Sequence, residues 1–183
     1  MRRHALTAAF FMFSSHAVLA DHCFSRSYTD AHLSANKDQS VRTIRLRLPE
    51  FRSDPGKVWV TFRKSHAEVL AETAAAEAAA AADEPAPTPK EPKLYQTDLT
   101  CWAPAAGAPE GAWQCGVECD GGTFTAWQSD NGLLLRTRGG FLVSGVCGEA
   151  GDEETPRYVT DINAIETTFR LDPVDTSECE NDG

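Results

Sequence analysis

Apolar and polar residues alternate along two neighbouring segments, residues 41–48 (VRTIRLRL) and 57–64 (KVWVTFRK). Side chains of a strand point alternately to its two faces, so each segment predicts a half-buried β-strand. Six apolar residues should face inward: Ile44, Leu46, Leu48, Val58, Val60 and Phe62. Residues 49–56 between the two segments are rich in turn formers, so we expect a β-hairpin with a long loop.

Seven further short apolar runs follow, separated by tight turns of glycine, asparagine and aspartate. They span residues 94–102, 112–118, 123–128, 133–137, 141–146, 158–160 and 165–171. We expect no core helix, and residues 29–35 (TDAHLSA) predict a capped helical turn that leads into the first strand. About nine short strands predict an all-β fold, an antiparallel meander forming a small barrel or sandwich.

An alanine- and proline-rich stretch, residues 67–92, interrupts this pattern. Its alanine run favours helix, but Val69 and Leu70 are its only large apolar residues, so the helix has no apolar face to bury. The prolines that follow favour an extended chain. We interpret the stretch as a solvated, partly disordered, low-complexity insertion within one domain.

The first twenty residues have the features of a secretory signal peptide. Arg2 and Arg3 precede an apolar run, and Val18-Leu19-Ala20 places small residues before the expected cleavage site. Cleavage after Ala20 leaves residues 21–183 as a single β domain. No later segment approaches the ~18 apolar residues of a membrane span, so we expect a periplasmic or secreted protein.

Six cysteines lie beyond the signal: Cys23, Cys101, Cys115, Cys119, Cys147 and Cys179. An even number in an exported chain indicates disulfide bonds. Only Cys23 precedes the insertion, so full pairing requires a bond across it. We favour Cys23–Cys179, Cys101–Cys115 and Cys119–Cys147, although the sequence leaves other pairings open.

The chain has 17 basic and 27 acidic residues, a net charge of −10, and loss of the two signal arginines makes it −12. An acidic exported protein is a poor candidate for binding nucleic acid. Residues 37–64 differ, with eight basic residues against three acidic ones.

The outward face of the hairpin carries the candidate ligand-binding residues Arg45, Arg47, Trp59 and Arg63. Arginines beside an aromatic ring can hold anionic or sugar-like ligands by forked hydrogen bonds and stacking. The simpler interpretation is that these arginines pair with the acidic excess on neighbouring strands.

Catalytic and metal-binding patterns are weak. Cys115 and Cys119 are separated by three residues in strand-and-turn sequence, which favours disulfides over a redox or zinc site. The histidines left after cleavage, His22, His32 and His66, show no ligand spacing. We therefore assign no catalytic residue, metal or cofactor.

Four segments carry a family resemblance: CFSRSYTDAHL, VRTIRLRL, CGVECDGG and the closing FRLD. They resemble a group of uncharacterised exported proteins of alphaproteobacteria over most of the mature chain except the insertion. The group has no assigned activity, so the resemblance implies a shared domain and supplies no catalytic residue.

We expect a non-catalytic binding or interaction module of the cell envelope, whose partner is an anionic small molecule or an envelope protein. One alternative is a hydrolase that uses carboxylates or His32. Another is an inhibitor that presents the disulfide-braced loop at residues 103–111.

Overall fold

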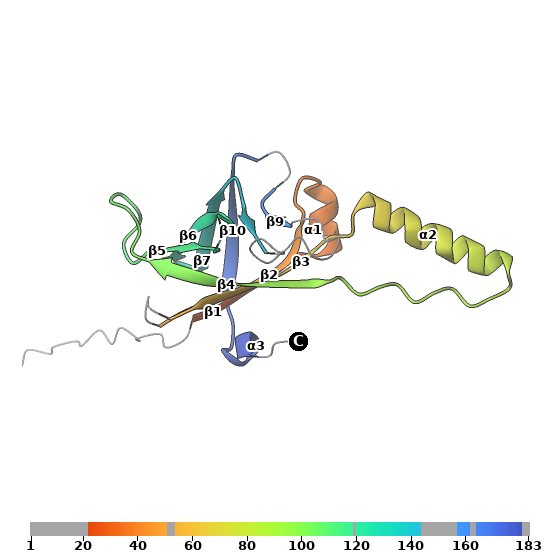
Figure 1. The fold of residues 1–183 in the computed structure, drawn as a ribbon, viewed down its shortest axis with the longest axis horizontal. Coiled ribbons are helices and arrows are strands. Elements are labelled where there is room, and N and C mark those ends of the chain that lie inside the picture. Colours follow the sequence, from red (N-terminus) through yellow and green to blue (C-terminus); the bar gives the residue numbers. More distant parts are fainter. Residues whose placement is uncertain (1–21, 51–53, 119, 144–156, 162–163, 181–183) are drawn as a thin grey trace, which may run out of the picture.

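Eight antiparallel strands close into a barrel in the computed structural model (Figure 1). The structure describes residues 22–50, 54–118, 120–143, 157–161 and 164–180. Around the barrel the strands follow the order β1-β10-β7-β6-β5-β4-β3-β2. The predicted antiparallel all-β meander is confirmed, and its form is a barrel.

The barrel strands are β1 (His22–Ser27), β2 (Val41–Leu48), β3 (Gly56–Phe62), β4 (Leu94–Trp102), β5 (Trp113–Gly116), β6 (Thr123–Ser129), β7 (Gly132–Arg138) and β10 (Glu166–Pro173). Strands β8 (Phe141–Leu142) and β9 (Tyr158–Val159) pair with each other. The helices are α1 (Asp30–Ala35), α2 (His66–Ala81) and α3 (Ser177–Glu180). The end of the predicted strand at 141–146 lies outside the described residues.

The hairpin of β2 and β3 has the predicted alternation. Ile44 lies opposite Val60, and both are fully buried. Strand β3 ends at Phe62, two residues earlier than predicted, because Ser65 already caps α2.

Strand β1 was not among the predicted strands. It pairs with β2 over six residues and with β10 over two, which closes the barrel. Its sequence, HCFSRS, lacks an apolar alternation, so its strand conformation depends on pairing with its two neighbours.

The β6–β7 connection is the tight turn that Asp130-Asn131-Gly132 predicts, since Ser129 pairs directly with Gly132. Gly132 has a φ of +126°, and a Cβ atom there would lie 2.2 Å from the carbonyl oxygen of Leu171 on β10. Glycine is therefore required where β7 begins.

Apolar side chains fill the barrel interior. The largest fully buried side chains include Phe124, Phe141, Ile44, Leu46, Leu48, Leu99, Leu133, Leu135 and Leu171. They belong to one continuous cluster contributed by strands from all around the barrel. The interior is thus a packed core, and ligand sites must be sought on the outside.

Two predicted disulfides are confirmed. Cys23–Cys179 joins β1 to α3, and Cys101–Cys115 joins directly opposite residues of β4 and β5. Cys119 and Cys147, and therefore their predicted bond, lie outside the described residues, as does the predicted signal peptide. The two disulfides indicate an oxidising, extracytoplasmic compartment.

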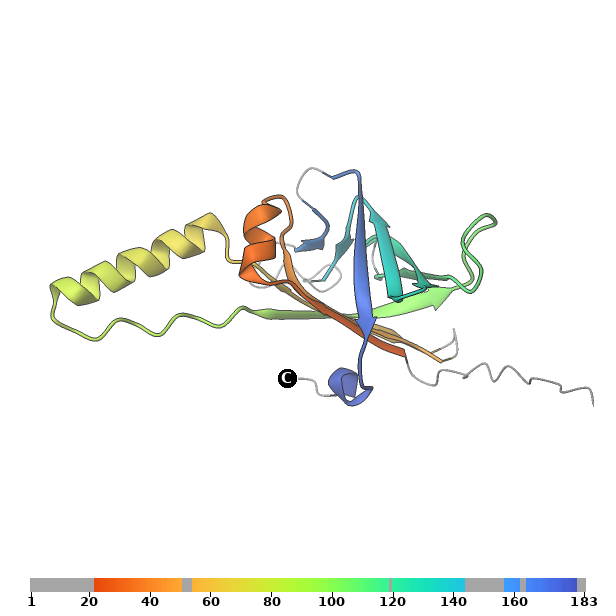
Figure 2. The ribbon, with the colours of Figure 1, turned by 180° about the vertical axis from the view of Figure 1, so that it is seen from behind.

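The alanine-rich stretch forms a helix that projects from the barrel (Figures 1 and 2). The Ser65 hydroxyl accepts from the Glu68 backbone N–H, and the Glu68 carboxylate accepts from the Ser65 N–H at 2.6 Å, which completes a capping box. No residue of α2 is buried, as its sequence predicts. Residues 83–93 then return to β4; we call residues 65–93 the arm. In the described part of the chain, no helix combines the length and apolar character needed to cross a bilayer.

Candidate cleft between the arm and the barrel

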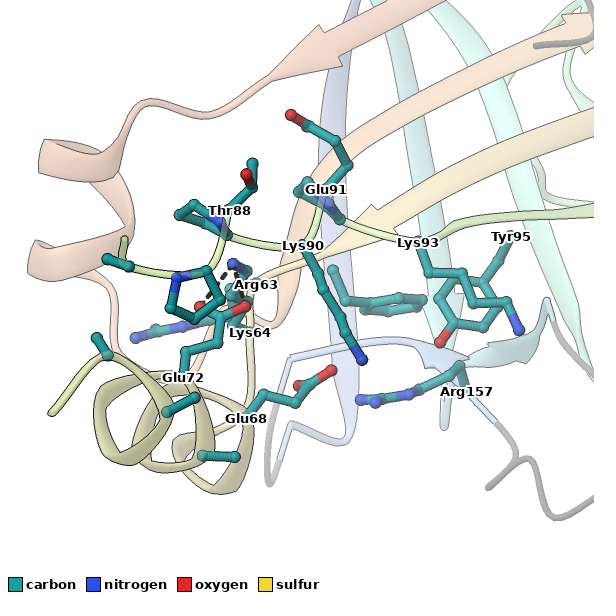
Figure 3. A pocket seen from close by; sticks show the side chains of 18 residues that line it. Arg63, Lys64, Glu68, Glu72, Thr88, Lys90, Glu91, Lys93, Tyr95 and Arg157 are labelled. Carbon is teal, nitrogen blue, oxygen red and sulfur yellow. Dashed lines mark hydrogen bonds and ion pairs between the residues drawn. The ribbon is translucent and has the colours of Figure 1, made fainter. Parts of the chain in front are cut away.

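A cleft of about 860 Å³ lies between the arm and the end of the barrel (Figure 3). Its lining comes from α2, from the returning half of the arm, and from the ends of β3 and β4 with Arg157. The residues are Phe62, Arg63, Lys64, Glu68, Ala71, Glu72, Ala75, Ala76, Ala86, Pro87, Thr88, Pro89, Lys90, Glu91, Pro92, Lys93, Tyr95 and Arg157.

Two aromatic residues form the barrel side of the cleft. Phe62 ends β3 and Tyr95 lies near the start of β4, with ring centres 5.5 Å apart in an edge-to-face arrangement. The Arg157 guanidinium lies 5.8 Å from the Phe62 ring centre, and the Lys93 amine lies 5.4 Å from that of Tyr95. These distances are typical of cation–π contacts, so the aromatic end of the cleft is also cationic.

The walls along the arm are small and apolar. Ala71, Ala75 and Ala76 lie on one face of α2, because together with Glu68 and Glu72 they follow the i, i+3, i+4, i+7, i+8 spacing of a single helix face. Pro87, Pro89 and Pro92 contribute to the opposite wall. The wall residues thus offer methyl and methylene groups to anything held between them.

Glu72 ties the parts of the arm together. The Lys64 amine donates to both Glu72 carboxylate oxygens, at 2.7 and 2.8 Å, and the backbone N–H of Lys90 donates to the same carboxylate. The hydrogen bond from Lys64 is the main reason that the pKa of Glu72 is lowered. One carboxylate therefore links the end of β3, α2 and the returning segment.

Glu68, Lys90 and Arg157 point toward one another across the cleft (Figure 3). Hydrogen bonds from Ser65 lower the pKa of Glu68, and the charge of Arg157 lowers it further. Both Glu68 and Glu72 are thus held as anions at neutral pH, whereas a general acid needs a raised pKa. The arrangement is better suited to binding than to proton donation.

Three of the four predicted ligand-binding residues lie together, but against the C-terminal helix. Trp59 is only 1% exposed, packed with Cys23, Cys179 and Val174. The guanidinium of Arg45 lies 5.8 Å from the Trp59 ring centre, and Arg45 also donates to the backbone carbonyl of Glu178 in α3.

Arg47 is the third residue near the C-terminal helix, whereas Arg63 lies elsewhere. Arg47 borders a recess of about 20 Å³ beside the Cys23–Cys179 bond. Arg63 lies past the end of β3, donates to the carbonyls of Leu33 and Lys37 at 3.4 and 3.2 Å, and lines the cleft. The structure therefore separates Arg63 from the other three, and ligand binding by this set stays a prediction.

His32, the candidate of the hydrolase hypothesis, stacks on Tyr28 with ring centres 4.9 Å apart. Its Nε2 atom lies 3.0 Å from Oε1 of Gln39. These contacts fix the ring without joining it to a serine or a carboxylate. Within the described ranges, no three histidine, cysteine or acidic side chains are grouped to hold a metal ion.

The loop of the inhibitor hypothesis projects from the end of the barrel opposite the arm (Figures 1 and 2). The Cys101–Cys115 bond closes its base, and the adjacent Trp102 is 42% exposed.

The sequence predicted neither the cleft nor its use. One signal could have pointed to it, because basic residues lie near both ends of the insertion: Arg63 and Lys64 precede it, Lys90 lies within its last residues, and Lys93 follows it. Comparison with known proteins adds no assignment, since no protein-family model, curated protein or solved structure matches the chain.

Proposed function

We propose that the protein is a non-catalytic binding module of the cell envelope, and that it holds its ligand in the cleft between arm and barrel. Export through the signal peptide, with cleavage near Ala20, would deliver it to the periplasm or the exterior. The single observation that carries the proposal is the cleft itself, which combines apolar walls of alanine, proline and aromatic side chains with eight charged residues. Ligand sites commonly pair an apolar lining with polar groups that orient the ligand.

Two further observations support binding outside the barrel. The interior is occupied by packed apolar side chains, which removes the usual ligand site of a small barrel. Two arginines of the predicted hairpin face already have partners within the protein, since Arg45 and Arg63 both donate to backbone carbonyls. The cleft is a concave surface outside the packed interior.

The neutral dye Nile red, whose fluorescence increases in apolar surroundings, tests the site. We expect the wild-type protein to enhance its fluorescence. Ala75→Glu should reduce the enhancement by at least about half, because it places a charge on the apolar wall. Ala74→Glu is the matched control, since Ala74 is the preceding residue of α2 and does not line the cleft. Equal enhancement by the two variants would refute the proposal.

The disulfide-braced inhibitor is the second candidate, favoured by the exposed Trp102 beside the loop at residues 103–111. Exposed tryptophans are frequent anchors in protein interfaces. Trp102→Ala should then abolish capture of an envelope enzyme, while leaving Nile red binding unchanged. The hydrolase alternative requires that the protein hydrolyse a substrate and that His32→Gln abolish this activity.

A further inference from the structure

We infer that the ligand of the cleft is an anionic amphiphile, with an alkyl chain between the alanine and proline walls and a carboxylate or phosphate head at the cationic end. This inference rests on the proposed function, because it names the ligand class of the same site. It follows from two independent properties of the lining, its hydrogen-bonding capacity and its charge.

The walls are poorly suited to a peptide. The backbone N–H and C=O groups inside α2 bond to each other, and Pro87, Pro89 and Pro92 have no N–H to donate. A peptide backbone held there would leave many of its own polar groups unpaired, and each buried unpaired group opposes binding. An alkyl chain has no such groups and benefits from contact with the methyl groups of alanine.

The charge of the lining favours an anion. Five basic residues border the cleft, Arg63, Lys64, Lys90, Lys93 and Arg157, against the acidic residues Glu68, Glu72 and Glu91. Glu72 already accepts hydrogen bonds from Lys64 and from the Lys90 backbone, and Glu68 accepts one from Ser65. The cleft therefore has a cationic excess in a mature chain whose net charge we expect to be −12.

The position of the charges indicates where the head group lies. The Lys90 amine and the Arg157 guanidinium approach each other near Tyr95 at the barrel end of the cleft, and the Glu68 carboxylate points toward both (Figure 3). One carboxylate offsets only one of these two positive charges, so an acidic head placed beside them would still accept charge-assisted hydrogen bonds from both. At physiological ionic strength the Debye length is about 8 Å, so an acidic head in the cleft interacts more strongly with these nearby cations than with acidic residues elsewhere on the surface. The alkyl chain then extends along α2, away from the barrel.

Titration calorimetry of the full mature protein tests the ligand class with twelve-carbon probes below their critical micelle concentrations. Dodecanoate and dodecyl phosphate carry the two acidic heads, and dodecyltrimethylammonium carries a cationic head on the same chain. Acetate and inorganic phosphate supply the heads alone. We expect at least one anionic probe to bind at least about tenfold more tightly than the cationic probe, and the heads alone not to bind. The stronger of the two anionic probes distinguishes a fatty-acid-like ligand from a phospholipid-like one.

Variants locate the interaction. Lys90→Gln and Arg157→Gln should each weaken binding of the anionic probe about tenfold, by removal of one charge-assisted hydrogen bond. Lys37→Gln makes the same charge change on an exposed residue outside the cleft and should bind normally. Ala75→Glu should weaken binding at least about tenfold and Ala74→Glu should not, with unfolding midpoints confirming that all variants fold.

Equal affinity for anionic and cationic probes, or normal binding by both Lys90→Gln and Arg157→Gln, would overturn the inference. Failure of the anionic probes while Nile red still depends on Ala75 would refute the ligand class alone. If Ala75→Glu binds every probe as tightly as the wild-type protein does, the cleft is not the binding site, and the proposed function is refuted with it.

Discussion

Arg45 and Trp59 lie directly opposite each other on β2 and β3, with the guanidinium 5.8 Å from the centre of the indole ring. The pair forms part of the surface on which the C-terminal helix rests. Trp59 packs beneath Cys179, and Arg45 donates to the carbonyl of Glu178. Two outward-facing residues of the hairpin thus help to hold α3 against the barrel.

Replacement of Trp59 by alanine should be strongly destabilising. The side chain is 1% exposed, and truncation of a buried tryptophan typically costs about 3–5 kcal/mol of unfolding free energy. Trp102, which is 42% exposed, provides the matched control, and Trp102→Ala should cost less than half as much. Urea denaturation measures both, and similar losses would contradict the role of Trp59.

Loss of the two described disulfides should have unequal effects. Cys23–Cys179 spans 156 residues and Cys101–Cys115 spans 14. On the chain-entropy model these loops correspond to about 5 and about 3 kcal/mol of stabilisation. In urea denaturation, replacing both Cys23 and Cys179 by alanine should lower the unfolding free energy more than replacing both Cys101 and Cys115. The reverse order would show that packing around Cys101 and Cys115 outweighs loop closure.

The hairpin face and the cleft predict different results for Arg45→Ala combined with Arg47→Ala. The hairpin hypothesis requires the double variant to lose binding of an anionic ligand. Our proposal requires dodecanoate or dodecyl phosphate to bind it with wild-type affinity, since neither arginine lines the cleft. Calorimetry on the folded double variant decides between the two sites.

Asp161 should make stability depend on pH. Burial, with a smaller contribution from the charge of Asp38, raises the pKa of Asp161 above its usual 3.8. No described residue donates a hydrogen bond to its buried Oδ1 atom. The folded state therefore binds the proton more tightly than the unfolded state, so this carboxyl lowers stability as the pH rises from about 4 through the raised pKa.

Asp161→Asn should accordingly increase the unfolding free energy at pH 7 and reduce its decline between pH 4 and 7. Asp130→Asn, in the exposed β6–β7 turn, is the control. Urea titrations at several pH values measure the difference. An unchanged pH dependence in Asp161→Asn would contradict this account of the carboxyl.

Much of the barrel could be predicted because its strands have local signals. The alternation of Ile44, Leu46 and Leu48 determines which face of β2 is buried, and Gly132 marks a turn that other residues would obstruct. Strand β1 has no such signal, since Phe24 is its main inward apolar residue. Its conformation depends on pairing with β2 and β10, and pairing between distant segments is not encoded in a local pattern.

The candidate site was harder to predict for the same reason. Phe62, Tyr95 and Arg157 are far apart in sequence and meet only when the barrel closes. Helix α2 has no stripe of large apolar residues that would predict a contact surface, because its lining residues are alanines and glutamates. Trp59 lies on the outward face, as the alternation predicts, but its burial comes from packing against Cys179, which is far away in the sequence.

The central claim is that the cleft between arm and barrel is the ligand site, and photo-crosslinking tests it most directly. A neutral twelve-carbon alcohol carrying a diazirine on its chain would be irradiated with the full mature protein, and the labelled residues mapped by mass spectrometry. We predict labels on α2 and on residues 86–93, competed by unlabelled dodecanol and absent from Ala75→Glu. Labels concentrated on the hairpin face around Arg45 or on the loop at residues 103–111 would contradict the account.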